Sequence, residues 1–370
     1  EDAHGRNTAV GYKTLETQNA GADGNNTAVG YFAGQSVTTG IQNTLVGSLA
    51  GDALTDSDYN TVVGYQALST DTLGGRSTAI GYQTLANQNF TTATSAYNTA
   101  VGYSAGVAIT TGIQNTLIGA IAGDALTDAD YNVAVGVTAL GGDTKGNNST
   151  AIGYSALVAQ NFTTSTDSFN TAVGYEAGGA VTTGIQNTLI GSRAGDALTD
   201  ADYNTAVGMG ALGSDTLGSY STAIGRNALY SQNFTTATNS LNTAVGYAAG
   251  EGITTGTSNT LVGSGAGDAL TVGNSNVVVG TLALTADTKG DRNIAIGANA
   301  LEVQNFTTST DSYNTAVGHA AGASVTTGQY NTIMGGLAGD AITDADFNVA
   351  VGYAALTANT VGSKSVAIGR

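Results

Sequence analysis

The sequence predicts an all-β fold, a parallel β-solenoid or β-roll, and three observations lead to it. A five-residue unit of the form Asn-Thr-Ala-Val-Gly recurs 21 times, first at 7–11 and last at 365–369. Most copies are 17 residues apart, which is too short for a repeat built of paired helices. The unit alternates β-favouring residues and ends in glycine, a pattern typical of a short strand followed by a bend.

The rungs, as we call the segments from one unit to the next, are grouped in fours. After a partial repeat at 1–25, steps of 17, 17, 17 and 21 residues recur. We expect a single elongated solenoid over 1–370, on the order of 100 Å long if rungs stack about 4.8 Å apart. Its 72-residue superrepeats cover 26–97, 98–169, 170–241 and 242–313, and 314–370 is a partial fifth.

Each rung of a superrepeat has its own marker. The first carries Thr-Thr-Gly, as at 38–40, and the second an acidic loop, as at 52–58. The third has Asp-Thr near its end, as at 71–72, and the fourth holds a four-residue insertion around 89–91. Neither end of the chain carries a capping segment, so we expect a longer chain or end-to-end stacking into a filament.

The first and fifth places of the unit have structural roles. The fifth place is always glycine, which indicates a bend where a side chain would clash or where φ is positive. The first place is usually asparagine, and stacked copies would form a ladder of side-chain amides at the turn. The structural glycines of the first superrepeat are Gly30, Gly47, Gly64 and Gly81.

The second, third and fourth places decide which strand face is inside. The second and fourth share one face, and the fourth is always Val, Ile or Met, as in Val10 and Met334. The third, on the opposite face, is also always apolar, as in Ala28 and Leu45. Both faces therefore look buried, and we expect other copies of the chain to cover one of them in a homo-oligomer. The alternative is that small apolar residues lie outside at little cost.

Composition excludes several function classes. The 27 acidic residues outnumber the 10 Lys and Arg, and the resulting net charge of -17 argues against binding to nucleic acid or anionic membranes. Cysteine is absent, so there are no disulfides or thiolate metal sites. No stretch is long and apolar enough to insert into a membrane, and no export signal is visible in this segment.

The units at 26–34, 77–81 and 365–369 resemble the head repeats of trimeric autotransporter adhesins of the YadA type, and similar repeats occur in phage tail fibres. The resemblance covers every rung. It implies left-handed parallel β-rolls wound into a homotrimer, with apolar side chains buried between subunits. It further implies display outside a bacterium, at the cell surface, where such proteins bind host or matrix surfaces.

The acidic loops are candidate calcium sites, because alternating carboxylates supply the hard oxygen ligands that calcium prefers. The fourth superrepeat departs from the pattern, with Val272 and Asn274 where the others have Asp. A solvated turn that keeps fibres apart by charge is the alternative. The candidate ligands are Asp52, Asp56, Asp58, Asp124, Asp128, Asp130, Asp196, Asp200, Asp202, Asp340, Asp344 and Asp346.

Asn-Phe-Thr sequons recur once per superrepeat, inside the insertion that should bulge from the solenoid. They arise from one duplicated event and count as one observation. The candidate N-glycosylation sites are Asn89, Asn161, Asn233 and Asn305.

We expect no enzymatic activity. The chain has only two histidines, His4 in the irregular first rung and His319, so no His-based triad or metal site is expected. The segment 208–213 matches a dinucleotide-binding glycine pattern, but it is one copy of the repeat and no helix is expected after it. No cofactor is expected other than calcium.

Two further patterns suggest binding surfaces. Tyrosine often follows the fifth-place glycine, as at Tyr12 and Tyr31, where it would stack on sugars or cover the rim of a thin core. Threonines at the second place would form a row suited to ice, but Val133 and Ile294 interrupt it. We therefore expect a structural or adhesive extracellular fibre that self-associates and contacts surface glycans or matrix. A phage tail fibre and a glycan- or ice-binding solenoid are the alternatives.

Overall fold

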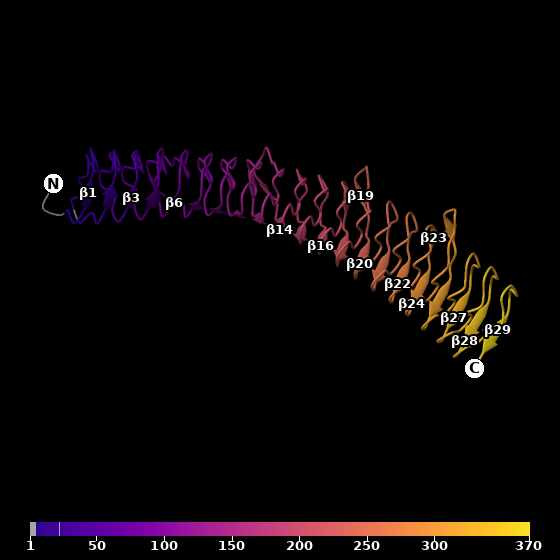
Figure 1. Ribbon diagram of the computed structural model, residues 1–370. Helices are drawn as coiled ribbons and strands as arrows, with labels where there is room; N and C mark the ends of the chain where they lie inside the picture. The colour runs from indigo at the N-terminus through magenta and orange to yellow at the C-terminus, as the bar shows by residue number, and fades with distance from the viewer. Residues whose placement is uncertain (1–4, 22) are drawn as a thin grey trace. The chain divides into compact units, whose positions relative to one another are not determined.

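The computed structural model describes residues 5–21 and 23–370, and it confirms the predicted fold. The described chain is a parallel β-solenoid with one three-residue strand in each of its 21 rungs. It divides into two units, 1–186 and 187–370, which are described separately. In both, the rungs follow one another in chain order (Figure 1). None of the described residues forms a helix that could span a membrane.

The first unit contains ten of the three-residue strands and four two-residue strands. The longer strands are β1 (Thr8–Val10), β2 (Thr27–Val29), β3 (Thr44–Val46), β4 (Thr61–Val63), β6 (Thr78–Ile80), β8 (Thr99–Val101), β9 (Thr116–Ile118), β10 (Val133–Val135), β12 (Thr150–Ile152) and β14 (Thr171–Val173). The shorter ones are β5 (Gly74–Gly75), β7 (Thr94–Ser95), β11 (Gly146–Asn147) and β13 (Thr166–Asp167).

The second unit contains eleven three-residue strands and again four short ones. The longer strands are β15 (Thr188–Ile190), β16 (Thr205–Val207), β18 (Thr222–Ile224), β20 (Thr243–Val245), β21 (Thr260–Val262), β22 (Val277–Val279), β24 (Ile294–Ile296), β26 (Thr315–Val317), β27 (Thr332–Met334), β28 (Val349–Val351) and β29 (Val366–Ile368). The shorter ones are β17 (Gly218–Ser219), β19 (Thr238–Asn239), β23 (Gly290–Asp291) and β25 (Thr310–Asp311).

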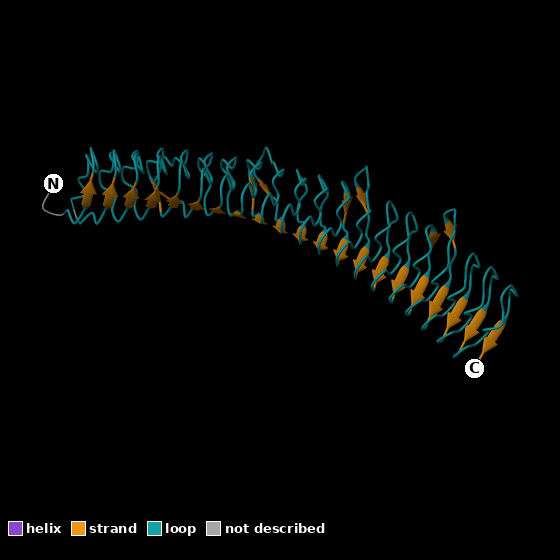
Figure 2. Ribbon diagram, viewed as in Figure 1, coloured by secondary structure: helices purple, strands orange, loops and turns teal. Residues whose placement is uncertain are grey.

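Neighbouring rungs pair in parallel and in register, so that each place of the repeat lies beside the same place of the next rung. Between β3 and β4, for example, Leu45 pairs with Val62 and Val46 with Val63. The short strands pair in the same way where a third rung meets the insertion of a fourth, as in β5 with β7. Equivalent side chains therefore form columns along each unit, and the strands lie side by side (Figure 2).

The fifth-place glycines combine a positive φ with a close backbone contact. Gly30, Gly47, Gly64 and Gly81 have φ values of +145°, +141°, +142° and +137°. A Cβ on Gly64 would lie 2.0 Å from the carbonyl oxygen of Gly81. Glycine is required here for two reasons: an added side chain would be strained at this φ, and it would collide with the next rung.

The first-place asparagines form a buried ladder of amides. The backbone N–H of Asn43 donates to Asn26 Oδ1 at 2.8 Å, and Asn60 N–H donates to Asn43 Oδ1 at 2.9 Å. The Asn26 Nδ2 donates in turn to the carbonyl oxygen of Gly40 across the rung, at 2.8 Å. The ladder satisfies backbone groups that would otherwise be buried without partners.

The large side chains of the core occupy different places in successive rungs. In the second rung of the first superrepeat, Leu45 fills the third place and Gly51 the ninth, where a Cβ would lie 2.9 Å from Leu45 Cδ2. In the third rung the smaller Val62 is matched by a buried Leu68 at the ninth place. The superrepeat is therefore a pattern of core packing as well as of loops.

The third place is the inner face of the strand. Its side chain is fully buried in every rung from Ala28 to Ala350. The second and fourth places point outward, and their residues are exposed or half-buried throughout. The sequence alone did not decide which face of the strand is inside, because both faces are apolar. Within one chain, only the third-place face is buried.

Candidate functional site

The outward side chains of the second and fourth places form a surface that we call the strand face. It consists mostly of threonine and valine at the second place and of valine, isoleucine and methionine at the fourth. Val29, Ile118 and Met334 expose 37%, 40% and 44% of their surfaces. Soluble monomers seldom expose apolar side chains in a contiguous row of this kind, and such rows usually mark interaction surfaces.

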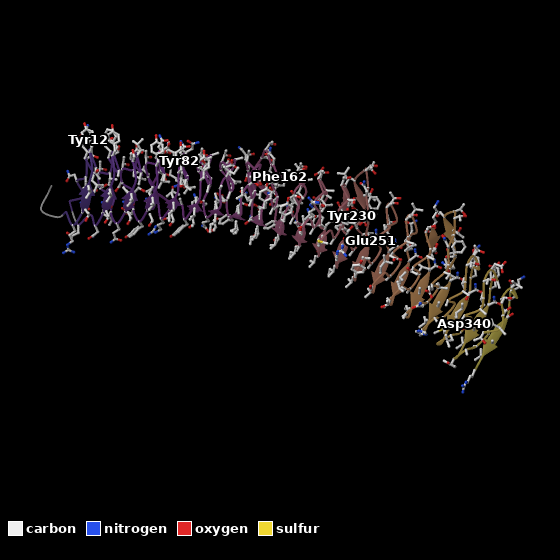
Figure 3. All side chains as sticks on the ribbon, viewed as in Figure 1. Tyr12, Tyr82, Phe162, Tyr230, Glu251 and Asp340 are labelled. Atoms are coloured by element: carbon white, nitrogen blue, oxygen red, sulfur yellow. The ribbon has the colours of Figure 1, made fainter. Side chains whose placement is uncertain are left out.

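Aromatic residues border the strand face in two columns, one from the sixth place and one from the last place of each rung. In the sixth-place column, Tyr82 stacks on Tyr65 and on Tyr103, with ring centroids 5.4 and 5.3 Å apart. In the last-place column, Tyr330 stacks on Tyr313 and Phe347 at 5.6 and 4.9 Å. All of these rings are exposed. Figure 3 labels Tyr12 and Tyr82 of the sixth-place column.

Charge is distributed unevenly around the rung. No Asp or Glu occupies the second, fourth, sixth or last place of a rung, although the chain has 27 of them. Four basic residues lie in the last-place column and two in the sixth-place column, which makes six of the 10 in the chain: Arg6, Arg76, Arg292 and Lys364, then Arg226 and Arg370. The acidic residues are all carried by the rest of the rung.

Four of these six basic residues stack on aromatic neighbours in their columns: Arg76, Arg226, Arg292 and Arg370. The guanidinium of Arg76 lies 5.2 Å from the ring centre of Tyr59 and 5.6 Å from that of Tyr97. Arg292 lies 5.5 Å from the ring of Tyr313 in the same way. These are cation–π distances, so the cations extend the aromatic columns instead of interrupting them.

The acidic loops place their carboxylates at the tenth, fourteenth and sixteenth places. The sixteenth-place Asp58 accepts a hydrogen bond from Ile41 N–H at 2.8 Å, and Asp56 accepts one from Thr39 Oγ1 at 2.5 Å. Burial raises the pKa of Asp52 above its ordinary value. The loops of the second and fifth superrepeats repeat the pattern, with Asp130 and Asp346 accepting backbone N–H groups at 2.8 Å.

Within residues 5–21 and 23–370, no three His, Asp or Glu side chains are grouped closely enough to hold a metal ion. The carboxylates of one loop are spread along the rung, and several are already hydrogen-bonded to the rung before. Calcium binding by these loops stays a prediction.

The sequon asparagines lie at the base of the insertion. Asn161, Asn233 and Asn305 are exposed, and Asn89 is half-buried. Each Oδ1 accepts a hydrogen bond from a threonine of the rung before, for example Thr144 Oγ1 to Asn161 at 3.1 Å. The following phenylalanine is buried, as Phe162 illustrates (Figure 3). Glycosylation at these positions stays a prediction.

The histidines do not form a site in the described residues. His319 is exposed in the sixth-place column, and His4 lies outside the described residues. The segment 208–213 forms the end of one strand unit and the turn after it, without a helix.

Four third rungs carry a buried carboxylate to which the sequence assigned no role, whereas the fifth has Asn359 at the same place. Asp71 is fully buried, and its Oδ1 accepts from Gly74 N–H and Phe90 N–H, both at 3.0 Å. Its Oδ2 accepts from Gln88 Nε2 at 2.6 Å. The signal was present in the 72-residue recurrence of Asp with Gln 17 residues later. The equivalent aspartates are Asp143, Asp215 and Asp287.

Comparison of the chain with models of known protein families finds no match, and comparison with curated protein sequences finds none either.

Proposed function

We propose that the chain is the subunit of an extracellular structural fibre, a homotrimer at a bacterial surface that self-associates through its strand face and serves in adhesion. One observation carries the self-association: the fourth-place side chains are apolar in every rung and yet lie on the outward face of the single chain. The resemblance of the repeats to trimeric adhesin heads supports the trimer, the surface location and the adhesive role.

Charge supports the choice of this face. The chain carries a net charge of -17, which opposes the approach of two copies. The second and fourth places hold no charged residue. Association through these places therefore puts no acidic side chain into the contact between copies. Burial of apolar surface would then stabilise the assembly at about 25 cal/mol per Å².

Sedimentation velocity tests self-association through substitutions on the strand face. We expect the unaltered chain to sediment as an oligomer, and the double variant Ile118→Lys with Ile152→Lys to sediment as a monomer. Both isoleucines are fourth-place residues, exposed by 40% and 38%. Burying several lysine ammonium groups at each subunit contact would cost far more free energy than burial of the isoleucines contributes.

Val303→Lys is the matched control, because Val303 is an apolar residue of similar exposure, 43%, outside the strand face. It should leave the oligomer intact. A stable monomer of the unaltered chain at micromolar concentration would contradict the proposal. Antibody labelling of intact cells that express the protein tests the surface location separately.

The strand face also supports a second candidate, ice binding. The second-place threonines of β2, β3, β4, β6, β8 and β9 stand in one uninterrupted row, from Thr27 to Thr116, and point outward. Regularly spaced hydroxyl and methyl groups can order water. Self-association would bury this row, so the two functions exclude each other at this face. A monomer with thermal hysteresis would favour ice, and an oligomer without hysteresis would favour the fibre.

A further inference from the structure

One pocket of the second unit lies beside the sixth-place column. It has a volume of about 410 Å³, and its lining includes Arg193, Asp196, Gly210, Gly213, Asn227 and Tyr230. These six residues occupy the seventh and tenth places of three successive rungs. The remaining lining residue, Met209, is at the sixth place of the middle rung, so none lies at the second or fourth place of the strand face. Pockets of small-molecule sites begin at about 300 Å³, so the space is large enough for a ligand.

The pocket exists because one rung has glycine at both the seventh and the tenth place. The equivalent pairs in the other superrepeats are Gln66 with Ser69, Thr138 with Gly141, Leu282 with Thr285 and Ala354 with Thr357. The backbone does not require Gly210, whose φ is +65°, because Thr138 and Leu282 adopt +57° and +54° at the same place. What Gly210 and Gly213 contribute is therefore room for the Tyr230 ring and the Asn227 amide, which lie within 3.1–3.4 Å of the Cβ position of Gly210.

An aromatic ring and a fixed amide bound the opening. Tyr230 is 43% exposed and lies against the glycines, so that a Cβ on Gly213 would be 3.1 Å from Tyr230 Cε2. Asn227 Nδ2 donates to Glu251 Oε1 at 3.0 Å, and Asn227 Oδ1 would be 3.1 Å from a Cβ on Gly210. The amide is thus held with its oxygen toward the space that Gly210 leaves. Figure 3 labels Tyr230 and Glu251 on successive rungs.

The geometry points to a binding site for a neutral pyranose. A sugar ring offers an apolar C–H face, which packs on an aromatic ring such as that of Tyr230. Its hydroxyl groups can donate to the Asp196 carboxylate and to Asn227 Oδ1, and can accept from the Arg193 guanidinium. The net charge of -17 disfavours an acidic sugar. Only the third superrepeat combines these residues, so each chain has one such site.

The site deepens the proposed adhesive role by naming a ligand class, and it rests on that role only for its biological use. Its residues lie outside the strand face, so sugar binding and self-association are measured by separate experiments. A monomeric chain that binds sugar would contradict the proposed fibre and support the sugar site. An oligomer that binds no sugar would support the fibre and contradict the site.

Calorimetric titration of the full chain with the methyl pyranosides of glucose, galactose, mannose and N-acetylglucosamine tests the site. At least one should bind saturably with one equivalent per chain. Gly210→Thr with Gly213→Ser fills the pocket with residues that the chain already carries at Thr138 and Ser69, and should abolish binding without unfolding. Tyr230→Ala should weaken binding about tenfold.

A transplant provides the matched gain of function. The second superrepeat already has Asp124 and Gly141 at the equivalent places. Ile121→Arg, Val137→Met, Thr138→Gly, Ser155→Asn and Val158→Tyr would reproduce the lining there, and Gly179→Glu would supply the partner of the amide. The stoichiometry should then rise from one to two. The site is overturned if no methyl pyranoside binds saturably, if the filled variant binds like the unaltered chain, or if methyl glucuronide binds more tightly than every neutral sugar.

Discussion

At the scale of the residue, two adjacent glycines of the second unit show what the fifth place demands. Gly335 has a φ of +134°, and a Cβ on it would lie 2.4 Å from the carbonyl oxygen of Gly352. Its neighbour Gly336, at the sixth place, has no such φ, and a Cβ there would meet nothing closer than 3.7 Å. Tyrosine, serine and histidine occupy the same sixth place elsewhere in the chain.

We therefore expect Gly335→Ala to lower the free energy of unfolding by about 2–4 kcal/mol, since it adds a strained φ and forces two backbones apart. Gly336→Ala should change it by less than about 0.5 kcal/mol. Urea unfolding followed by circular dichroism measures both. Equal effects of the two substitutions would show that the fifth place does not depend on glycine for its backbone.

At the scale of the rung, buried carboxylates make stability depend on pH. Asp287 is fully buried, and burial raises its pKa even though Gln304 Nε2 and the N–H groups of Phe306, Gly290 and Lys289 donate to it. The folded chain then binds a proton more tightly than the unfolded chain does, whose Asp pKa is about 3.9. Between these two pKa values the folded state holds more protons, so stability rises as the pH falls.

The unfolding midpoint in urea should accordingly increase as the pH falls from neutrality through the folded-state pKa of Asp287, and level off below about pH 3.9. Asp287→Asn should remove part of this increase, because Asp52, Asp124 and Asp130 also have raised pKa values and would supply the rest. A midpoint that falls over the same range in the unaltered chain would contradict the sign.

Core packing within successive rungs gives a second prediction at this scale. A Cβ on Gly106 would lie 2.6 Å from Leu117 Cδ1 of the next rung, whereas the same ninth place accommodates Leu140 two rungs later at a φ of +53°. Gly106→Ala should therefore destabilise through contact with Leu117, in addition to the strain of a side chain at a φ of +60°. Combined with Leu117→Val, its cost should shrink by about 1 kcal/mol in a double-mutant cycle. If the effects of the two substitutions on the free energy of unfolding are additive, the cost of Gly106→Ala does not come from its contact with Leu117.

The strands and bends could be predicted because the unit occurs 21 times, and the pattern common to all copies is clear even where single copies vary. The inner face was not predictable, since Ala and Val at successive places are both apolar and only stacking decides which is inside. The burial of Asp71 was not predictable from its own rung, because its partners Gln88 and Phe90 come from the next rung. The pocket at Gly210 escaped for the opposite reason, as it depends on a departure from the repeat.

At the scale of the molecule, the contacts between adjacent rungs depend on which of the four rung types are neighbours. A first rung places Gly106 between Leu85 of the rung before and Leu117 of the rung after, with its Cβ position 3.0 and 2.6 Å from their methyl groups. A fourth rung offers the Oε1 of Gln88 to Asn98 of the following first rung, at 2.8 Å. The stability of such a chain is approximately a sum of rung stabilities and nearest-neighbour contacts, so the order of rung types matters.

Two deletions separate rung order from chain length. Removing 98–169 joins Tyr97 to Asn170 and keeps every rung next to its proper type, because Asn170 takes the place of Asn98 beside Gln88. Removing only 98–114 deletes a single rung but sets Leu85 directly against Leu117, with no glycine between them. We expect the shorter deletion to lower the urea midpoint more than the longer one, although it removes 17 residues instead of 72. If the midpoint simply followed chain length, the four rung types would be interchangeable and the superrepeat would have no role in packing.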